Sequence, residues 1–396
     1  MFQRSGRYLP LIAPQYNPQK YKTVYFSLFC VATFSYNIYL TTCKYKNFNA
    51  SKTYYILQWT GNYTPLDLMG LGSKKFIELQ CRYKNCYVTN NKSYLPIVTD
   101  FDALVFNGDE KYYENIHFKP PERSPSQVYV FGQLESAHNY EACFPDFENF
   151  FNWTWTYKLD SDVRWSYIII HDLESHIVGP KPYMEWPIEM KPLEDKKTKA
   201  ILDGKTKAAA WFVSRCTTLG KREKFVRKLI RRLLKLNLTL DVYGECSDLI
   251  CPRDKSEQCN DMVKRDYYFY LSFENSLAPD YVTEKLLIAL NNLAIPVVYG
   301  GADYNRFLPP GSYLNARKLG PKQLAMTMKE IMGDRTKFHD FFRWRNHFRY
   351  KRGENDSEIC NICTALNENT PHNLQLRDGF REWWNDGYNY RCKGLM

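Results

Sequence analysis

The sequence predicts an α/β protein whose two domains face each other across a cleft, and two observations carry this prediction. Short apolar segments typical of strands alternate with helix-like segments in both halves of the chain, which is the pattern of open, mostly parallel sheets. The 396 residues give room for about two domains. Prolines and a mixed-charge run separate the halves, so we place the linker at 191–207, an N-terminal domain at 53–190 and a C-terminal domain at 208–365.

Local patterns predict the elements of each domain. In the first half, apolar runs predict strands at 54–59, 86–88, 103–106 and 128–131. In the second half, similar runs predict strands at 208–214, 239–243, 269–273 and 296–299, and apolar residues at helical spacing predict helices at 221–235, after Asp280 and at 334–352.

The best-defined unit runs from the strand at 269–273 through a helix to the strand at 296–299. Asp280 is a favourable N-cap residue, so we expect the helix to begin near Tyr281 and to carry Glu284 and Lys285 in its first turn. Ligands of such sheets bind beyond the carboxyl ends of the strands, where free N–H groups and the helix dipole favour an anion. The unit therefore predicts an anion site to which Lys285 adds a full charge.

The net charge of +11 indicates an acidic partner. Nucleic acid is not supported, because the basic residues are spread along the chain and no helix-turn-helix, RNP or zinc-finger pattern occurs. An anionic sugar nucleotide accounts for the charge equally well.

The N-terminal part of the chain predicts a membrane anchor. Residues 23–43 carry no charge and are just long enough to span a bilayer, and the tail at 1–23 has Lys and Arg but no acid, which places it in the cytosol. No small-residue cleavage site follows, so we expect an uncleaved signal-anchor helix at 24–43 and a stem at 44–52. The alternative is that this segment belongs to a buried core.

Cysteines and glycosylation sequons favour an oxidising compartment. Ten of the twelve cysteines follow the predicted anchor, and an even set with short spacings suits disulfides. Five sequons are candidate glycosylation sites: Asn49, Asn62, Asn91, Asn237 and Asn355. A sixth sequon, at Asn152, lies in an aromatic run, so we expect it to be buried and unmodified.

The stretch at 273–285 resembles the signature of the α1,3-fucosyltransferases of glycosyltransferase family 10, F-E-N-S-x(3)-D-Y-V/I-T-E-K. Other segments from about residue 54 to residue 363 match in the family's order. The wording at 297–304 and at 242–247 is more similar to the invertebrate members than to the vertebrate Lewis enzymes.

This resemblance implies two Rossmann-like domains of the GT-B type behind a transmembrane helix, followed by a C-terminal tail at 366–396. It implies a single-pass type II protein of the Golgi membrane with its catalytic part in the lumen. The reaction would transfer fucose with inversion from GDP-β-L-fucose to the 3-hydroxyl of N-acetylglucosamine on a glycoprotein N-glycan. The acceptor is the core or an antennal N-acetylglucosamine, and the wording leans towards core or invertebrate-type acceptors. No cofactor would be required, although a divalent metal could stimulate transfer.

Glu135 lies where the family has F-E-S-P, and the resemblance makes it the general base. By residue type alone it would be a surface carboxylate in a loop after the strand at 128–131. Ala137 replaces the family's proline, which predicts a looser loop.

The resemblance also implies a set of donor-binding residues. Arg222 and Lys285 would stabilise the departing diphosphate, and Glu284 would accept the ribose hydroxyls. Arg215 stands where the family has Asn, and the alternative for Arg222 is a solvated basic helix face. Asn275 and Tyr281 would line the donor pocket.

Asp160 and Asp162 form a D-x-D pair that, taken alone, is typical of a divalent metal holding a nucleotide sugar. The family transfers without a bound metal, so the resemblance implies structural roles and no metal site. Arg164 follows where the family reads towards Tyr-Gly, so that wall of the acceptor cleft is expected to differ. Two other functions remain open: a metal-dependent D-x-D glycosyltransferase, and an inactive membrane-anchored glycan-binding homologue.

Cys360 and Cys363 form a C-x-x-C pair that is compatible with a zinc half-site, a redox pair or a structural clip. The family carries its C-terminal C-x-x-C as a disulfide. The resemblance therefore implies a bond between Cys360 and Cys363, and we expect Cys81 and Cys86 to pair likewise.

Overall fold

The computed structural model describes residues 29–30, 43–44, 52–60, 66–109, 119–353, 358–368, 375–386 and 392. The chain divides into two compact units, Met1–Lys52 and Thr53–Met396. In the first unit, β1 (Phe29–Cys30) pairs antiparallel with β2 (Cys43–Lys44). The rest of the predicted anchor, the tail at 1–23 and the sequons at Asn49, Asn62 and Asn355 lie outside the described residues. In the described part of the chain, no helix combines the length and the apolar character that crossing a bilayer requires.

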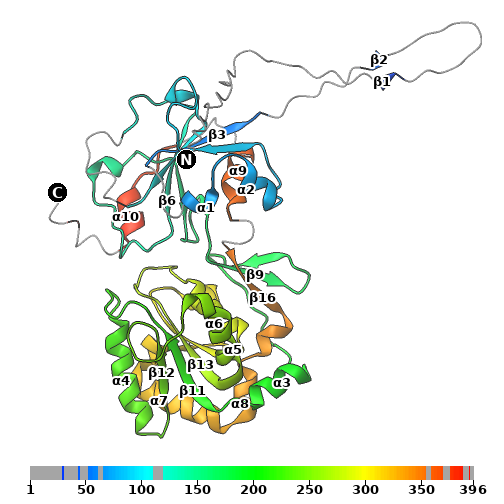
Figure 1. Ribbon diagram of the computed structural model, residues 1–396, viewed down its shortest axis with the longest axis vertical. Coiled ribbons are helices and arrows are strands. Elements are labelled where there is room, and N and C mark those ends of the chain that lie inside the picture. Colours follow the sequence, from blue (N-terminus) through cyan, green and yellow to red (C-terminus); the bar gives the residue numbers. More distant parts are fainter. Residues whose placement is uncertain are drawn as a thin grey trace, which may run out of the picture. The chain divides into compact units, whose positions relative to one another are not determined.

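The first sheet of the larger unit confirms the four strands predicted in the N-terminal half and adds two more (Figure 1). All neighbouring strands are parallel. The order is β4 (Cys86–Thr89), β3 (Tyr54–Gln58), β5 (Ala103–Asn107), β6 (Val128–Gln133), β7 (Trp153–Thr156) and β8 (Val163–Arg164).

Both faces of this sheet are buried, and because successive side chains of a strand point to opposite sides, neighbouring residues belong to different cores. Val105 and Val130 face one core, which is covered by α1 (Leu66–Met69), α2 (Lys74–Glu78) and α9 (Cys360–Glu368). Phe106 and Phe131 face an aromatic core that includes α10 (Phe380–Asn385).

The C-terminal segment of the chain is therefore part of the first domain. Phe380 and Trp384 are fully buried against the first sheet, and Cys392 is bonded to Cys143. The sequence predicted a tail at 366–396, but its described residues pack into the N-terminal domain because two large aromatic side chains fill the core there.

The second sheet confirms the strands predicted in the C-terminal half. Its parallel strands run in the order β12 (Leu240–Tyr243), β11 (Lys207–Phe212), β13 (Tyr267–Phe273), β14 (Ile295–Tyr299) and β15 (Leu314–Asn315). One face packs against α4 (Arg222–Leu234), α7 (Ala316–Gly333) and α8 (Arg335–Asp340). The other packs against α5 (Ser256–Asp266) and α6 (Glu284–Asn291). Helices on both faces of a parallel sheet define a doubly wound α/β domain.

A small antiparallel sheet, formed by two strands that follow the first sheet in the chain and one that follows the second, corrects one prediction. Its order is β10 (Ile177–Gly179), β9 (Ile168–Asp172) and β16 (Phe348–Arg352). The predicted helix at 334–352 is wrong beyond residue 340, because Phe348 and Tyr350 are buried while Arg349 and Lys351 are exposed. This period of two fits a strand with one covered face. The predicted linker contains α3 (Lys196–Asp203).

All ten cysteines that follow the predicted anchor form disulfides, but the predicted pairing within each short motif is wrong. Cys81 bonds to Cys360 and Cys86 to Cys363. Cys360 and Cys363 are three residues apart and therefore share one face of α9, which is turned towards the first sheet. Each sulfur thus meets a separate partner, and neither a zinc half-site nor a dithiol pair remains. The other bonds join Cys143 to Cys392, Cys216 to Cys246 and Cys251 to Cys259.

Removing one of the two bonds that hold α9 should lower stability clearly. The bond from Cys81 to Cys360 spans 279 residues of sequence, but the bond from Cys86 to Cys363 already closes nearly the same loop. The loss should therefore be that of a typical disulfide, about 2–4 kcal/mol, and not that of a very long loop. We expect C81S/C360S to show a lower unfolding midpoint in guanidinium, with the bond between Cys86 and Cys363 still present. Peptide mapping without reduction tests the pairing itself, and a peptide linked between Cys360 and Cys363 would contradict it.

Candidate active site

Three loops meet at the carboxyl end of the second sheet, where the sequence predicted an anion site. Gly220 lies before α4, and its N–H donates to the carbonyl of Asn275 after β13 (3.1 Å). A Cβ on Gly220 would come within 3.0 Å of that oxygen. A Cβ on Gly301, after β14, would lie 1.7 Å from the carbonyl oxygen of Leu277. Only glycine allows these close backbone approaches, so the two glycines bring the loops after β11, β13 and β14 together.

The helix that follows β13 begins later than predicted. Asp280 has a φ of 54° and does not cap α6, because its carboxylate accepts the N–H of Leu159 (3.3 Å) and pairs with Arg306 (3.0 Å). Thr283 occupies the N-cap position, and Glu284 and Lys285 are the first residues of α6. The prediction that Asp280 caps a helix starting near Tyr281 is therefore wrong, whereas the placement of Glu284 and Lys285 in the first turn is confirmed.

Lys285 is held in a compact polar network. Its Nζ lies 2.7 Å from Oγ1 of Thr283, 3.0 Å from Oε1 of Glu284 and 3.3 Å from Oε2 of Glu274. Burial opposes the charged ammonium, but Glu274 and Glu284 outweigh it and raise the pKa of Lys285. Lys285 therefore presents a fixed positive charge at the start of α6.

Glu274 is an organising residue that the sequence did not place in the donor site. It is buried, and it accepts hydrogen bonds from the N–H (2.8 Å) and Oγ1 (3.0 Å) of Thr283. Burial raises the pKa of Glu274, against the opposing effect of Lys285. Its position inside the Phe-Glu-Asn-Ser motif was the available signal, but the motif alone does not show that its carboxylate turns back towards Thr283 and Lys285.

Several buried polar atoms near this network lack a partner among the described residues. They include Nε of Arg222, Oδ1 of Asn275, Oγ of Ser276 and the hydroxyl of Tyr304. Arg222 is buried, donates from Nη1 to the carbonyl of Phe273 (2.5 Å), and has its pKa lowered by burial. Native interiors leave few polar atoms unsatisfied, so a cluster of unsatisfied polar atoms at one edge of a sheet indicates that a polar ligand binds there.

Glu135 lies beyond β6 and receives a contact from the second domain. Its Oε2 accepts the hydroxyl of Tyr281 (3.0 Å) and the side-chain amide of Asn139 (3.2 Å). The other carboxylate oxygen has no hydrogen-bond partner among the described residues, and the side chain is half-buried. Tyr281 is buried against Tyr157 and Tyr167. The structure therefore brings together the predicted base and a predicted donor-site residue.

The three departures from the family's wording have separate local roles. The N–H of Ala137 donates to the hydroxyl of Tyr157 (3.4 Å), a bond that proline cannot make. Arg164 donates to the carbonyl of Pro180 (2.5 Å). Arg215 is exposed in the loop after β11.

The two carboxylates of the D-x-D pair bind different groups. Oδ2 of Asp160 accepts the indole N–H of Trp383 (2.8 Å). Oδ2 of Asp162 accepts both the N–H and the hydroxyl of Thr154 (2.9 and 2.8 Å) and pairs with Arg377 (3.1 Å). These contacts support the structural interpretation, because each side chain fastens the C-terminal segment to the first domain. One group of three potential metal ligands occurs among the described residues, Glu141 with Cys143 and Cys392, and its two cysteines are bonded to each other.

Chelation should therefore leave the glycosyl transfer that the resemblance implies largely intact. Since Asp160 and Asp162 are engaged with protein groups, we expect EDTA to change the initial rate by less than about twofold, which is less than 0.5 kcal/mol in activation free energy. A rate measured with and without EDTA at fixed ionic strength checks this. Loss of activity that added Mn²⁺ restores would revive the metal-dependent alternative.

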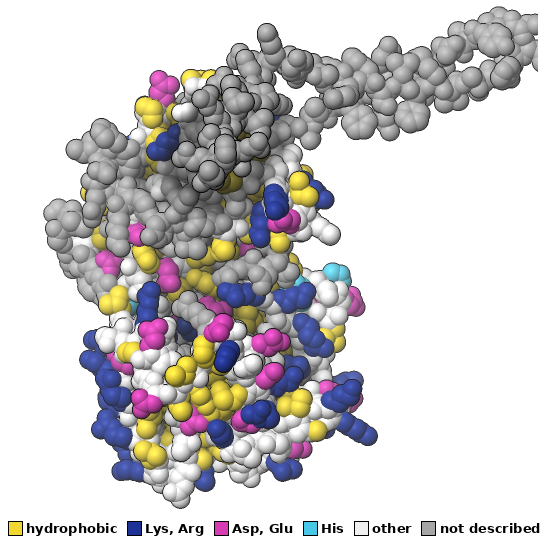
Figure 2. All heavy atoms as spheres, viewed as in Figure 1, with side chains coloured by type: hydrophobic (Ala, Val, Ile, Leu, Met, Phe, Trp, Pro, Cys, Tyr) yellow, Lys and Arg dark blue, Asp and Glu magenta, His cyan; other side chains and the backbone are white. Residues whose placement is uncertain are grey.

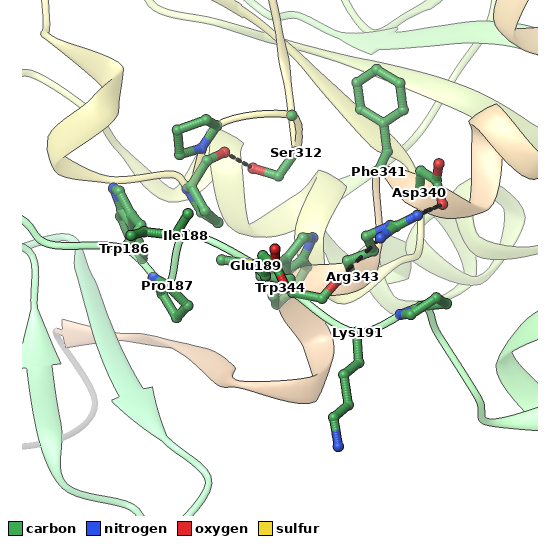
Figure 3. Close-up of a pocket in the computed structure, with 15 residues that line it drawn as sticks. Trp186, Pro187, Ile188, Glu189, Lys191, Ser312, Asp340, Phe341, Arg343 and Trp344 are labelled. Atoms are coloured by element: carbon green, nitrogen blue, oxygen red, sulfur yellow. Dashed lines mark hydrogen bonds and ion pairs between the residues drawn. The ribbon is translucent and has the colours of Figure 1, made fainter.

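A large hollow in the described structure belongs to a different region (Figure 3). It has a volume of about 910 Å³ and lies between the extended segment 186–192, the turn at 309–312 and residues 340–344. Arg343 pairs there with Asp340 (2.7 Å), and Ser312 donates to the carbonyl of Pro309 (2.7 Å). None of the predicted site residues lines this hollow, so size alone does not locate the candidate site.

Of the sequons in the described residues, two are accessible. Asn91 and Asn237 are exposed, as a glycosylation site requires. Asn152 is buried, and its Oδ1 accepts the N–H of Tyr129 (2.8 Å) and a contact from Arg123. This supports the expectation that Asn152 carries no glycan.

Comparison with known proteins identifies the family. A model described as the N-terminal part of fucosyltransferases matches residues 51–168, and one described as glycosyltransferase family 10 (fucosyltransferase), C-terminal part, matches residues 202–382. An α-(1,3)-fucosyltransferase C of Drosophila melanogaster is 38% identical over 78% of this chain and 71% of its own length. A 3-galactosyl-N-acetylglucosaminide 4-α-L-fucosyltransferase of Bos taurus is 32% identical over 72% of this chain and 70% of its own.

A crystal structure of an α1,3-fucosyltransferase with GDP-fucose has 16% identity, covers 81% of this chain and 93% of that one, and has a TM-score of 0.47. The two family models and the curated relatives carry the assignment. The chain therefore belongs to glycosyltransferase family 10, the fucosyltransferases, and is an enzyme of the α1,3-fucosyltransferase group.

Proposed function

We propose that this enzyme transfers fucose, with inversion, from GDP-β-L-fucose to the 3-hydroxyl of an N-acetylglucosamine on a glycoprotein glycan. The observation that carries the proposal is the hydrogen bond from Tyr281 to Glu135. It sets a carboxylate, one oxygen of which has no partner in the described part of the chain, beside the loops that hold Arg222 and Lys285. A base next to an anion site is what a single displacement with a diphosphate leaving group requires.

The reaction follows from these positions. The free oxygen of Glu135 takes the proton of the acceptor hydroxyl while that hydroxyl's oxygen attacks the anomeric carbon of fucose. The bond from the anomeric carbon to the β-phosphate oxygen breaks, and GDP leaves with the electron pair. Lys285 and Arg222 stabilise the negative charge that builds on the diphosphate.

The remaining donor contacts follow the family's pattern. Glu284 accepts the ribose hydroxyls, and its half-buried carboxylate suits this role. Burial opposes its charged form, but Lys285 outweighs burial and lowers the pKa of Glu284. Asn275 and Ser276 offer to the bound nucleotide sugar buried polar atoms that have no partner among the described residues.

The acceptor is the open part of the proposal. The two relatives differ in name, one being an α-(1,3)-fucosyltransferase and the other a 4-α-L-fucosyltransferase of a galactosyl-N-acetylglucosaminide. The wording of residues 297–304 and 242–247 favours a core or invertebrate-type acceptor.

A glycan panel tests both the activity and the acceptor. The purified protein is incubated with GDP-fucose and glycans that expose either the core or an antennal N-acetylglucosamine, and products are read by mass spectrometry. We expect one added deoxyhexose on a core acceptor. Binding of GDP-fucose and glycan without any product would favour the inactive glycan-binding homologue instead.

We further propose a single-pass type II protein of the Golgi membrane, anchored by residues 24–43. Because the larger compact unit begins at Thr53, a protein in which a cleavable signal peptide replaces the residues before Lys44 should be secreted. It should keep the transfer rate of the full chain within about twofold, since the candidate site residues all belong to the larger unit. Rate per mole of secreted protein is the measurement. An aggregated product would show instead that the N-terminal segment belongs to the core.

A further inference from the structure

The end of α4 furthest from the candidate active site forms a groove lined almost entirely by cations. The groove has a volume of about 510 Å³, and five of its six lining residues are basic. They come from both α4 and α7, with Pro321 as the sixth, and are Lys228, Arg231, Arg232, Lys235 and Lys322. Figure 2 shows Lys and Arg side chains gathered along the edge of the second domain where α4 lies in Figure 1.

The spacing of these residues places the charges in one stripe. Lys228, Arg232 and Lys235 recur at intervals of four and three residues, so they lie on one face of α4, next to the face that Leu229 and Leu233 bury. From Lys228 to Lys235 the helix advances about 10 Å. Like charges at this spacing destabilise a helix, and the helix dipole offsets that only in the last turn.

No acidic side chain of the described residues neutralises the groove. The one acid near the start of α4, Glu223, is buried and accepts the hydroxyl of Thr218 (3.1 Å). On α7, Glu330 is taken by Lys337. None of the five groove cations forms an ion pair with a described residue, and Arg231 donates from Nε to the carbonyl of Arg227 (3.3 Å).

We propose that this groove binds a sulfated polysaccharide chain, separately from the transfer site. A stripe of charges about 10 Å long along a concave surface matches a linear polyanion better than a single phosphate. Arginine forks suit sulfate oxygens as they suit phosphate oxygens. Among the residues that the structure describes, no aromatic side chain lines the groove, so these residues offer none of the stacking platforms with which proteins hold single-stranded nucleic acid.

The five cations of the groove are accessible to a ligand from solution. All five cations are exposed, so they are not held for a core or for a second element of this chain among the described residues. Each contact with a sulfate is individually weak and screened by salt. Affinity therefore depends on several contacts acting together, and it should fall steeply with ionic strength.

Heparin is the probe for the test, and the full chain is the protein. We expect K228Q/R231Q/R232Q/K235Q to bind heparin at least about tenfold more weakly than the natural sequence at physiological salt, by the sum of four screened contacts. Glutamine keeps the helix propensity of α4. The matched control is K84Q/K196Q/K197Q/K351Q, which removes the same four charges from exposed positions elsewhere and should change binding by less than about twofold.

The possible outcomes divide clearly. Equal losses of heparin affinity in the two variants would show that net charge, and not the groove, determines binding, and they would overturn the proposal. A groove variant that still binds heparin but no longer binds phosphatidylserine vesicles would overturn it as well. Unfolding midpoints check that both variants fold. If the groove variant does not fold, acetylation of the natural protein decides: heparin should protect Lys228, Lys235 and Lys322 but not Lys84 or Lys196, and uniform labelling would contradict the site.

Discussion

Replacing Glu135 with Gln is expected to lower the rate of fucosyl transfer by about 10²–10⁴-fold, the range that general-base catalysis contributes. The affinity for GDP should stay nearly unchanged. Glutamine is close to Glu135 in shape and can still accept the hydroxyl of Tyr281 through its amide oxygen, so only proton acceptance is lost. Initial rates together with calorimetric titration of GDP measure the two quantities separately.

The control for this variant is Glu141→Gln, which removes the next carboxylate along the same segment and should keep the rate within about twofold, as a group outside the reacting centre does. A Glu135→Gln enzyme that retains more than about a tenth of the rate would remove Glu135 from the role of base. Glu274 would then be the next carboxylate to test, because Asp162 already binds Thr154 and Arg377.

Replacing Lys285 with Ala should weaken GDP binding by about 1.5–3 kcal/mol, the contribution of a hydrogen bond to a charged group, and should lower turnover with it. The physical reason is that the diphosphate loses the charge fixed by Thr283, Glu284 and Glu274. Lys285→Met is the matched variant, because it keeps most of the apolar stem and removes the charge.

The unfolding midpoint should be measured on the same Lys285 variants. Either substitution leaves the buried carboxylate of Glu274 without its cation, and a buried charge without a partner is costly. We therefore expect a lower unfolding midpoint together with weaker GDP binding. A midpoint that falls while GDP affinity is unchanged would assign Lys285 to folding and not to the donor site.

Local patterns were sufficient for the parallel strands of both domains. Runs such as residues 128–131 and 296–299 are apolar throughout, and a strand buried on both faces needs such a run whatever its neighbours are. The sequence also predicted that Glu284 and Lys285 lie in the first turn of a helix, and they are the first two residues of α6.

The missed features depend on partners far away in the chain. Asp280 reads as a cap, but Arg306 takes its carboxylate. Residues 348–352 end the aromatic and basic run at 334–352 that was predicted to be one helix, but they pair with β9, from Ile168 to Asp172. Cys360 and Cys363 bond to residues nearly 280 positions earlier. No periodicity within a short window encodes these contacts, because they exist only once the chain has folded.

The candidate site also combines features that the local sequence predicts with contacts that depend on distant residues. The strand-helix-strand unit that contains Glu274 predicted an anion site after β13, and the structure leaves buried polar atoms of Asn275 and Ser276 there without partners among the described residues. The hydrogen bond from Tyr281 to Glu135 joins residues 146 positions apart. The family's pattern suggested both residues, but only the folded chain shows that they touch.

The anomeric configuration of the product tests the central claim most directly. A single displacement on GDP-β-L-fucose, with Glu135 as base, must invert the anomeric centre. We therefore predict that proton NMR of the purified product shows an α-linked fucose on the 3-hydroxyl of N-acetylglucosamine, with one GDP released for each fucose transferred. A β-linked product, or release of GDP without any fucosylated glycan, would contradict the account.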